Sequence, residues 1–214
     1  MKEAAASFPC GALTLEGAWH FPRGEGPFPA VVALHPHPLY GGDMDNNVVM
    51  AVGLALAEKG IAAFRLNFRG VGASQGSFAE GEGERDDVRA ALDFVSREPA
   101  INANWLGLAG YSFGAMVALP VAAAEVRVKA LAVISLPLLP PGLEPLKAFA
   151  RPKLILAGER DQFIPVSLLG ELVRGLPPPL EWEVLPGADH FWWGQEKPLA
   201  QRVAAFFARA FLAR

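Results

Sequence analysis

Cysteine is almost absent from this sequence, and long apolar runs are missing altogether. Cys10 is the only cysteine among 214 residues, so no disulfide can form within the chain and an oxidising compartment is not indicated. A membrane-spanning helix needs about 18 consecutive apolar residues, and no window of the sequence reaches that length. The opening stretch MKEAAASFPCGALTLEG also lacks the apolar segment of a secretory signal. We therefore expect a cytoplasmic protein that does not insert into a membrane.

An excess of basic charge is missing as well. The 19 Lys and Arg residues face 22 Asp and Glu residues, which gives a formal net charge of −3. Without a basic run, or a basic patch interleaved with aromatic residues, nucleic acid is not an expected partner. Hydrophobic residues make up 52% of the chain and charged residues 19%, which is typical of a well-packed globular protein. A small molecule is the expected partner, and the sequence leaves the oligomeric state open.

Apolar segments typical of strands alternate along the chain with segments typical of helices. The predicted strands are residues 11–21, 29–35, 60–68, 104–111, 129–136, 153–159 and 180–187. The predicted helices are residues 46–59 and 85–97, followed by helices beginning after Ser112, near Pro165 and near Lys197. Continuous apolar strands interleaved with helices indicate an α/β fold, with a mainly parallel sheet covered on both faces. Because no repeat or linker interrupts this pattern, we expect a single domain over residues 1–214.

The stretch GLAGYSFGAMVA (107–118) places Ser112 between Gly110 and Gly114, where a predicted strand gives way to a predicted helix. The pattern G-x-S-x-G at such a junction is typical of a nucleophile elbow, a sharp turn that lifts a serine hydroxyl above the sheet. Strand and helix come so close there that side chains two residues before and after the serine would collide, and glycine avoids the collision. We predict that Ser112 is a nucleophile rather than an incidental serine in a glycine-rich turn.

A serine nucleophile needs a base, and the base needs a carboxylate that orients it. Among the four histidines, His190 follows the last predicted strand, and Asp161 follows the strand before it. Both lie at carboxyl ends of strands, the edge where open α/β sheets carry their sites. Asp189 is the competing acid, ranked below Asp161 because adjacent residues rarely point their side chains at one another. The alternatives are a surface histidine at position 190 and a helix-capping role for Asp161.

In these positions and in this order, the motifs resemble those of the α/β-hydrolase superfamily. More narrowly, they resemble small bacterial serine hydrolases without a cap domain, related to dienelactone-hydrolase-like enzymes. The stretches that carry the resemblance are LHPHPLYGGDMDNNVV (34–49), RLNFRGVGASQG (65–76), GEGERDD (81–87), GYSFG (110–114), GERDQFIP (158–165) and GADHFWWG (187–194). The resemblance implies the α/β-hydrolase fold without a cap, a triad in the chain order Ser112, Asp161, His190, and no required cofactor. It does not name the ester.

Two backbone N–H groups are expected to bind the oxyanion that forms when the serine attacks. One belongs to Phe113, at the start of the helix after the nucleophile. The loop after strand 29–35 supplies the second donor in such folds, and His35-Pro36 stands where the superfamily commonly has a His-Gly pair. We predict the N–H of His37, since proline has none, with Leu39 and Tyr40 as alternatives.

Two other interpretations of these loops are weaker. A metal site at His35 and His37 with Asp43 or Asp45 lacks a third strong ligand at suitable spacing, so we predict no metal. The glycines of NFRGVGASQGS (67–77) do not match the dinucleotide-binding pattern G-x-G-x-x-G. Ion pairs and a helix N-terminus are expected to pin this loop instead, with Ser74 as a turn hydroxyl. The charged residues involved would be Arg69, Glu82, Glu84, Asp86 and Asp87.

Residues 135–152 occupy the place where larger relatives insert a cap. Here the segment is short, apolar and rich in proline, so it can at most roof a substrate pocket. The pocket residues would be Leu39, Tyr40, Trp192 and Trp193, with core packing as the alternative for the aromatic ones. An open, shallow pocket favours short acyl groups.

The sequence as a whole predicts a serine hydrolase of small carboxylic esters or thioesters that works through an acyl-enzyme. A peptidase or amidase with the same triad is the first alternative, although no anchor for a peptide terminus is evident. A non-catalytic binding protein on a hydrolase fold is the second, and an intact set of triad residues counts against it.

Overall fold

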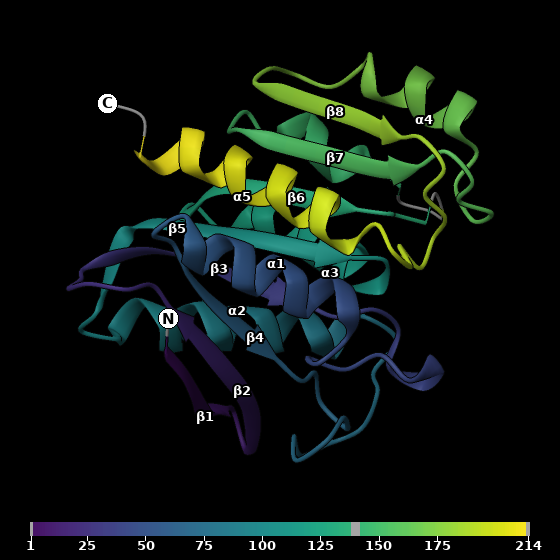
Figure 1. The fold of residues 1–214 in the computed structure, drawn as a ribbon. Helices are drawn as coiled ribbons and strands as arrows, with labels where there is room; N and C mark the ends of the chain where they lie inside the picture. Colours follow the sequence, from purple (N-terminus) through teal and green to yellow (C-terminus); the bar gives the residue numbers. More distant parts are fainter. Residues whose placement is uncertain (1, 138–141, 213–214) are drawn as a thin grey trace.

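The strands form one sheet in the computed structural model, which describes residues 2–137 and 142–212 (Figure 1). The order across the sheet is β1-β2-β4-β3-β5-β6-β7-β8. In chain order the strands are β1 (Lys2–Cys10), β2 (Leu13–Phe21), β3 (Phe28–Leu34), β4 (Ala62–Leu66), β5 (Ile101–Tyr111), β6 (Val128–Ile134), β7 (Lys153–Gly158) and β8 (Leu180–Leu185). β1 and β2 pair antiparallel with each other, and β2 pairs antiparallel with β4. All other pairs are parallel, which confirms the predicted mainly parallel sheet.

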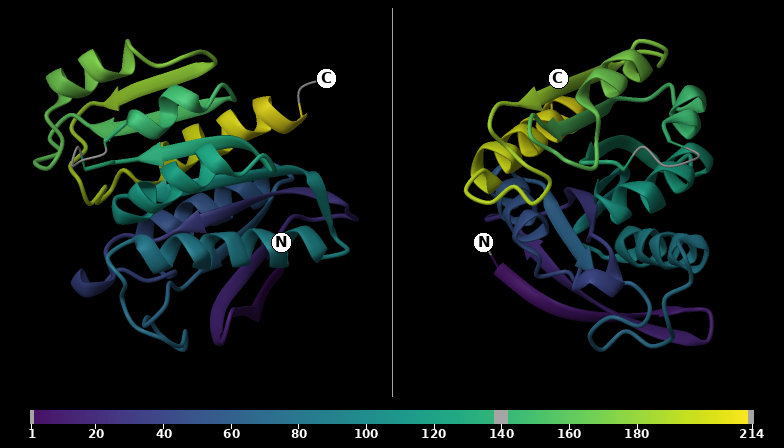
Figure 2. Two further views of the ribbon diagram at one scale, coloured as in Figure 1. Left: turned by 180° about the vertical axis from the view of Figure 1, so that it is seen from behind. Right: turned by 90° about the vertical axis from the view of Figure 1, so that its right-hand side faces the viewer.

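Helices cover both faces of the sheet. They are α1 (Asn47–Glu58), α2 (Glu82–Arg97), α3 (Phe113–Ala124), α4 (Val166–Val173) and α5 (Glu196–Leu212), with short 3₁₀ turns η1 (Pro38–Tyr40) and η2 (Glu144–Ala148). Side by side, α1 and α5 lie on one face, and α2 and α3 cover the other (Figures 1 and 2). Each face holds its own buried apolar cluster, so the central strands have buried side chains on both sides. This burial explains the continuous apolar runs of the sequence, since a strand with two covered faces has no solvent side.

The first strand is the element that the sequence analysis missed. It forms a hairpin with β2, in register from Lys2 opposite Phe21 to Cys10 opposite Leu13. Its sequence, KEAAASFPC, contains no β-branched residue, so its intrinsic preference for a strand is low. Pairing along the full length of β2 and burial of Phe8 and Cys10 hold it at the edge of the sheet instead.

The connection between β6 and β7 contains the segment that, by the sequence analysis, can at most roof a pocket. Residues 138–141 of this connection lie outside the described part of the chain. What is described adds only η2, which packs against α3, and no cap is inserted there. Across residues 2–137 and 142–212, no helix combines the length and the apolar character needed to cross a membrane.

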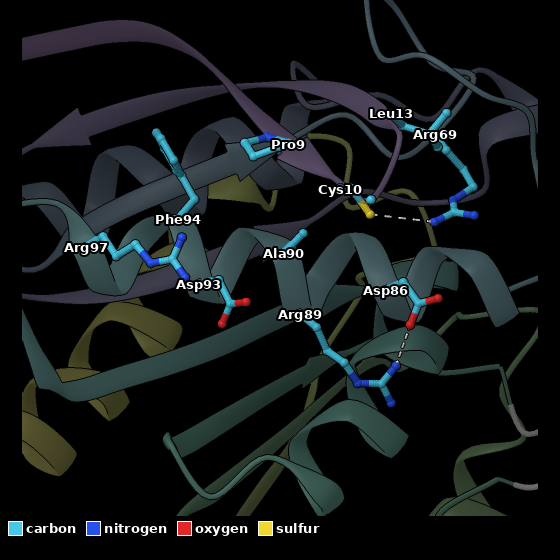
Figure 3. Close-up of a pocket in the computed structure, with 11 residues that line it drawn as sticks. Pro9, Cys10, Leu13, Arg69, Asp86, Arg89, Ala90, Asp93, Phe94 and Arg97 are labelled. Carbon is cyan, nitrogen blue, oxygen red and sulfur yellow. Dashed lines mark hydrogen bonds and ion pairs between the residues drawn. The ribbon is translucent and has the colours of Figure 1, made fainter.

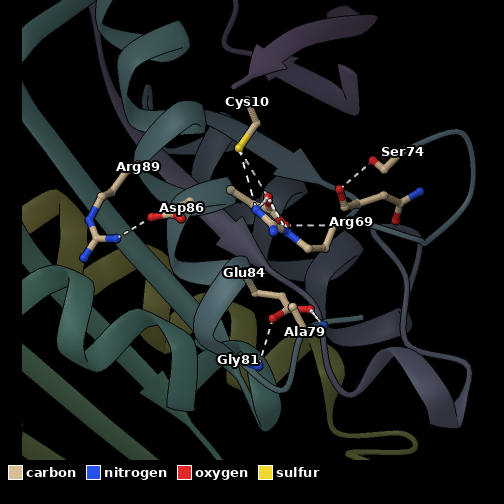
Figure 4. Close-up of polar contacts among 10 residues, drawn as sticks. Cys10, Arg69, Ser74, Ala79, Gly81, Glu84, Asp86 and Arg89 are labelled. Carbon is tan, nitrogen blue, oxygen red and sulfur yellow. Dashed lines mark hydrogen bonds and ion pairs between the residues drawn. The ribbon is translucent and has the colours of Figure 1, made fainter. Parts of the chain in front are cut away.

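A buried ion pair fixes the loop between β4 and α2 (Figure 4). The Asp87 carboxylate has no solvent-exposed surface and accepts hydrogen bonds from the Arg69 backbone N–H, 2.9 Å, and from Arg69 Nη2, 2.7 Å. Glu84 accepts from the backbone N–H groups of Ala79 and Gly81, both at 2.8 Å, and so caps α2. Ser74 Oγ donates to the carbonyl of Asn67, as a turn hydroxyl does. The prediction is therefore correct for these residues.

Glu82 and Asp86 behave differently from their two acidic neighbours. They point to solvent and pair with Arg85 and Arg89 one turn further along α2, rather than with Arg69. Such exposed pairs contribute little stability, because water already solvates both partners.

Removing the buried carboxylate should cost far more stability than removing its exposed neighbour. Asp87→Ala leaves the Arg69 guanidinium without its partner, and we expect the free energy of unfolding to fall by about 3–5 kcal/mol. Asp86→Ala removes the surface pair with Arg89 and should cost less than about 1 kcal/mol. Urea denaturation of both variants and the parent protein measures the difference. Equal losses for the two variants would contradict the structural role given to Asp87.

Candidate active site

Ser112 occupies a strained turn between β5 and α3. Its backbone angles are φ 54° and ψ −114°, at the N-cap of α3. A positive φ is costly for a residue with a side chain, by about 1–3 kcal/mol, and persists only where the surroundings enforce it. The Ser112 N–H donates to the carbonyl of Ile134 in the neighbouring strand β6, 2.9 Å, which ties the turn to the sheet.

The two glycines of the motif are required by close backbone contacts on both sides of the turn. A Cβ at Gly110 would lie 2.5 Å from the Gly114 oxygen and 2.6 Å from Ala115 Cα, so it would collide with the start of α3. A Cβ at Gly114 would lie 2.5 Å from the oxygen of Leu34 and 2.7 Å from that of His35. The second collision is therefore with the end of β3, a strand that the sequence motif does not contain.

Three side chains from the ends of different strands form one chain of contacts. Ser112 Oγ lies 3.0 Å from His190 Nε2, and His190 Nδ1 lies 3.0 and 2.9 Å from the two oxygens of Asp161. All three residues are buried, so water competes little for these contacts. A hydroxyl, an imidazole and a carboxylate in this order are able to move the serine proton to the imidazole while the carboxylate stabilises the cation that results.

Asp161 contacts His190, and Asp189 does not occupy that position. Asp161 Oδ1 also accepts the N–H of Phe163, 3.0 Å, which holds the carboxylate at the end of β7. The Asp189 carboxylate turns into its own loop, where Oδ1 accepts the N–H groups of Phe191 and Trp192, both at 2.9 Å.

The backbone N–H groups of Leu39, Tyr40, His37 and Phe113 differ in whether they already donate a hydrogen bond. Leu39 N–H donates to His37 Nδ1, 3.2 Å, and Tyr40 N–H donates to the His37 carbonyl, 3.1 Å, so both are engaged inside the loop. Within the described residues, the N–H groups of Phe113 and His37 donate no hydrogen bond. The His37 ring lies against the Phe113 ring, with centroids 5.0 Å apart, which brings the two loops together. Of the three loop N–H groups, that of His37 alone is not engaged within the described residues, and its role as an oxyanion donor stays a prediction.

His35 holds the end of β3 in place. Its Nε2 accepts the N–H of Phe68, 3.1 Å, and its Nδ1 donates to the Pro36 carbonyl, 2.7 Å. Burial lowers the pKa of His35 to about 4, so the ring is neutral at physiological pH. Its two hydrogen bonds already occupy both ring nitrogens. The described residues contain no group of three His, Cys, Asp or Glu side chains placed to hold a metal ion.

Hydrogen bonds from Tyr111 and Trp192 secure the loop that carries His190. Tyr111 Oη donates to the His190 carbonyl, 2.8 Å, from the position just before Ser112. Burial raises the pKa of Tyr111, which keeps its hydroxyl protonated and able to donate. Two residues later in the loop, Trp192 Nε1 donates to Ser135 Oγ at the end of β6, 3.0 Å. The sequence analysis selected neither Tyr111 nor Ser135, although Tyr111 lies inside the G-x-S-x-G motif, and it gave Trp192 a pocket role.

Trp192 does not line a pocket, contrary to the sequence analysis. It is fully buried in the apolar cluster beneath α5, and core packing was the alternative considered for it. Leu39, Tyr40 and Trp193 lie on the surface, with exposed fractions of 67%, 87% and 71%. Their contact with a substrate stays a prediction.

Comparison with known proteins points to one family. Residues 34–202 match the model of a family described as alpha/beta hydrolase domain. An uncharacterised protein of Rickettsia prowazekii is 34% identical over 172 residues, which cover 77% of this chain and 72% of the relative.

Two solved structures share both the fold and a substantial part of the sequence. An alpha-beta serine hydrolase homologue from Coxiella burnetii is 32% identical with a TM-score of 0.86, covering 96% of this chain and 97% of that chain. An α/β serine hydrolase without a lid from Xanthomonas campestris is 29% identical with a TM-score of 0.85, covering 98% and 95%. The chain therefore belongs to the α/β-hydrolase superfamily, as one of its small members without a cap domain.

Proposed function

We propose that the protein hydrolyses small carboxylic esters or thioesters through an acyl-enzyme formed on Ser112. The observation that carries the proposal is the unbroken chain of contacts from Ser112 Oγ through the His190 imidazole to the Asp161 carboxylate. A serine hydroxyl alone is a weak nucleophile, and this arrangement is the one that activates it.

In the acylation step, Ser112 Oγ attacks the carbonyl carbon of the ester as its proton passes to His190 Nε2. Asp161 holds the Nδ1–H tautomer and stabilises the imidazolium. The carbonyl oxygen becomes an oxyanion, which we expect the N–H groups of Phe113 and His37 to bind. These donors are fixed before the reaction, so no reorganisation is needed as the charge develops.

Collapse of the tetrahedral intermediate breaks the bond to the leaving group. His190 gives its proton to the departing alkoxide or thiolate, and the acyl group remains on Ser112. A water molecule then repeats the sequence, losing a proton to His190 and releasing the carboxylic acid. No step requires a metal or an organic cofactor, because each proton and charge is handled by a residue of the chain.

Esters are proposed over amides because an alkoxide is a better leaving group than an amide nitrogen and the sequence shows no evident anchor for a peptide terminus. An alkoxide leaves readily when His190 gives it a proton, whereas a peptidase also needs an anchor for the rest of the peptide. Measuring p-nitrophenyl esters against the matching p-nitroanilides separates the two activities.

Exchanging each candidate acid for its amide should separate the two carboxylates. Asp161→Asn cannot accept the Nδ1–H as a carboxylate does, so we expect kcat to fall by about 10⁴ with KM little changed. Asp189→Asn retains Oδ1 for the N–H groups of Phe191 and Trp192 and should be mild. The measurement is kcat and KM for one short p-nitrophenyl ester.

Ser112→Ala provides the lower limit of activity and a check on contaminating esterases. Circular dichroism of each variant shows whether the fold is intact. A crippled Asp189→Asn beside an active Asp161→Asn would refute the assignment of the acid, and an active Ser112→Ala would refute the mechanism.

A further inference from the structure

A cavity of about 290 Å³ lies along α3, beginning beside the residue that follows Ser112. One wall is the face of α3 that carries Phe113, Met116 and Leu119. Leu136 and Pro137, just after β6, form a second wall, and residues around the start of α2 form the rim. From Phe113 to Pro120 the helix rises about 10 Å, so the lining residues of α3 extend about that far from the turn.

Both walls belong to elements that are hydrogen-bonded to the backbone of Ser112. The Met116 N–H donates to the Ser112 carbonyl, 3.2 Å, and the Ser112 N–H donates to the Ile134 carbonyl, 2.9 Å. Leu136 and Pro137 follow Ile134 by two and three residues. The apolar walls therefore come from the two elements between which Ser112 lies, and the cavity begins at Phe113, the residue after Ser112.

The rim of the cavity carries more negative than positive charge. Glu80, Glu82 and Arg85 line it, and Arg85 Nη1 is already paired with Glu82, 3.0 Å. A second carboxylate brought in by a ligand would meet two glutamates and one arginine, whose Nη1 is paired with Glu82 while its buried Nε has no hydrogen-bond partner among the described residues. The apolar walls and this rim suit a ligand group that is uncharged.

A second, larger cleft among the described residues does not have these properties. It measures about 620 Å³ and lies between α2 and the β1–β2 hairpin, where Arg69, Asp86, Arg89, Asp93 and Arg97 line it (Figure 3). Burial, together with Asp87, raises the pKa of its Cys10 thiol to about 11, so the sulfur is not a nucleophile at neutral pH. The residues that line this cleft lie in the β1–β2 hairpin, at Arg69 and in α2. None of these segments is next to Ser112 in the chain.

We propose that the cavity along α3 holds the acyl group of the substrate, and that the substrates are esters of uncharged carboxylic acids with medium-length chains. The inference rests on the proposed function, because it needs Ser112 as the acylated residue. A volume near the lower end of the range for small-molecule pockets, roughly 300–1,000 Å³, favours a chain of this size over a long lipid.

Acyl chain length and a volume change at Met116 test the assignment together. We expect kcat/KM to rise about tenfold to a hundredfold from the p-nitrophenyl acetate to the hexanoate and to fall for the dodecanoate. Met116→Trp fills the cavity and should lower the hexanoate-to-acetate ratio of kcat/KM at least about tenfold. Met116→Ala enlarges it and should raise the dodecanoate-to-hexanoate ratio.

Met50→Trp is the matched control, because Met50 is also a half-buried methionine on a helix, on the opposite face of the sheet. It should leave both ratios unchanged. An ω-carboxylated hexanoyl ester tests the charge of the rim and should react at least about tenfold more slowly than the hexanoate.

The outcomes distinguish a failure of the proposed function from a failure of the assignment of the acyl group to this cavity. If the parent protein hydrolyses none of these esters, the proposed function itself fails. If it hydrolyses them but the ratios are the same in Met116→Trp, Met116→Ala and the parent, the acyl group binds elsewhere. A carboxylated ester that reacts as fast as the hexanoate, or faster, would overturn the preference for uncharged acids.

Discussion

The candidate site depends on one steric constraint, the close approach of β3, β5 and α3 around Ser112. A single methyl group at Gly110 or Gly114 would lie within 2.5 Å of a backbone oxygen, so only glycine permits this packing. The contact holds Ser112 in a positive-φ conformation that the residue would not adopt alone. The strain is offset by the packing of two buried apolar clusters, one on each face of the sheet.

The parallel sheet brings the other groups to the same edge. Asp161 follows β7 and the His190 loop follows β8, so both approach Ser112 from the carboxyl ends of neighbouring strands. Hydrogen bonds from Tyr111 to the His190 carbonyl and from Trp192 to Ser135 fasten this loop to β5 and β6. The imidazole is thus positioned by rigid elements, and a small displacement of a reacting group is costly for catalysis.

Features with a local cause were predictable from the sequence. Gly110 and Gly114 reveal the elbow because the steric requirement lies within five residues, and the strand ends reveal Asp161 and His190 because open α/β sheets carry their sites there. Features that depend on distant packing were not. Trp192 and Trp193 are neighbours in one loop, yet the first is fully buried and the second is 71% exposed, and no sequence period distinguishes them.

The burial of the Arg65 side chain and the walls of the cavity along α3 could not be predicted from the sequence either. Arg65 lies in β4 and is almost fully buried, because Glu3, His20 and Asp45 from three other segments accept its hydrogen bonds. The cavity beside Phe113 likewise combines residues from the start of α2, from α3 and from the segment after β6. Only the folded chain brings such partners together.

Covalent labelling tests the central claim, that Ser112 is a nucleophile activated by His190. The protein is treated with a fluorophosphonate, digested, and the modified residue is identified by mass spectrometry. The account predicts one adduct, on Ser112 in the segment GLAGYSFGAMVA, and a labelling rate at least about 10³ lower in a folded His190→Ala variant. An adduct on another residue, or equal labelling rates with and without His190, would contradict it.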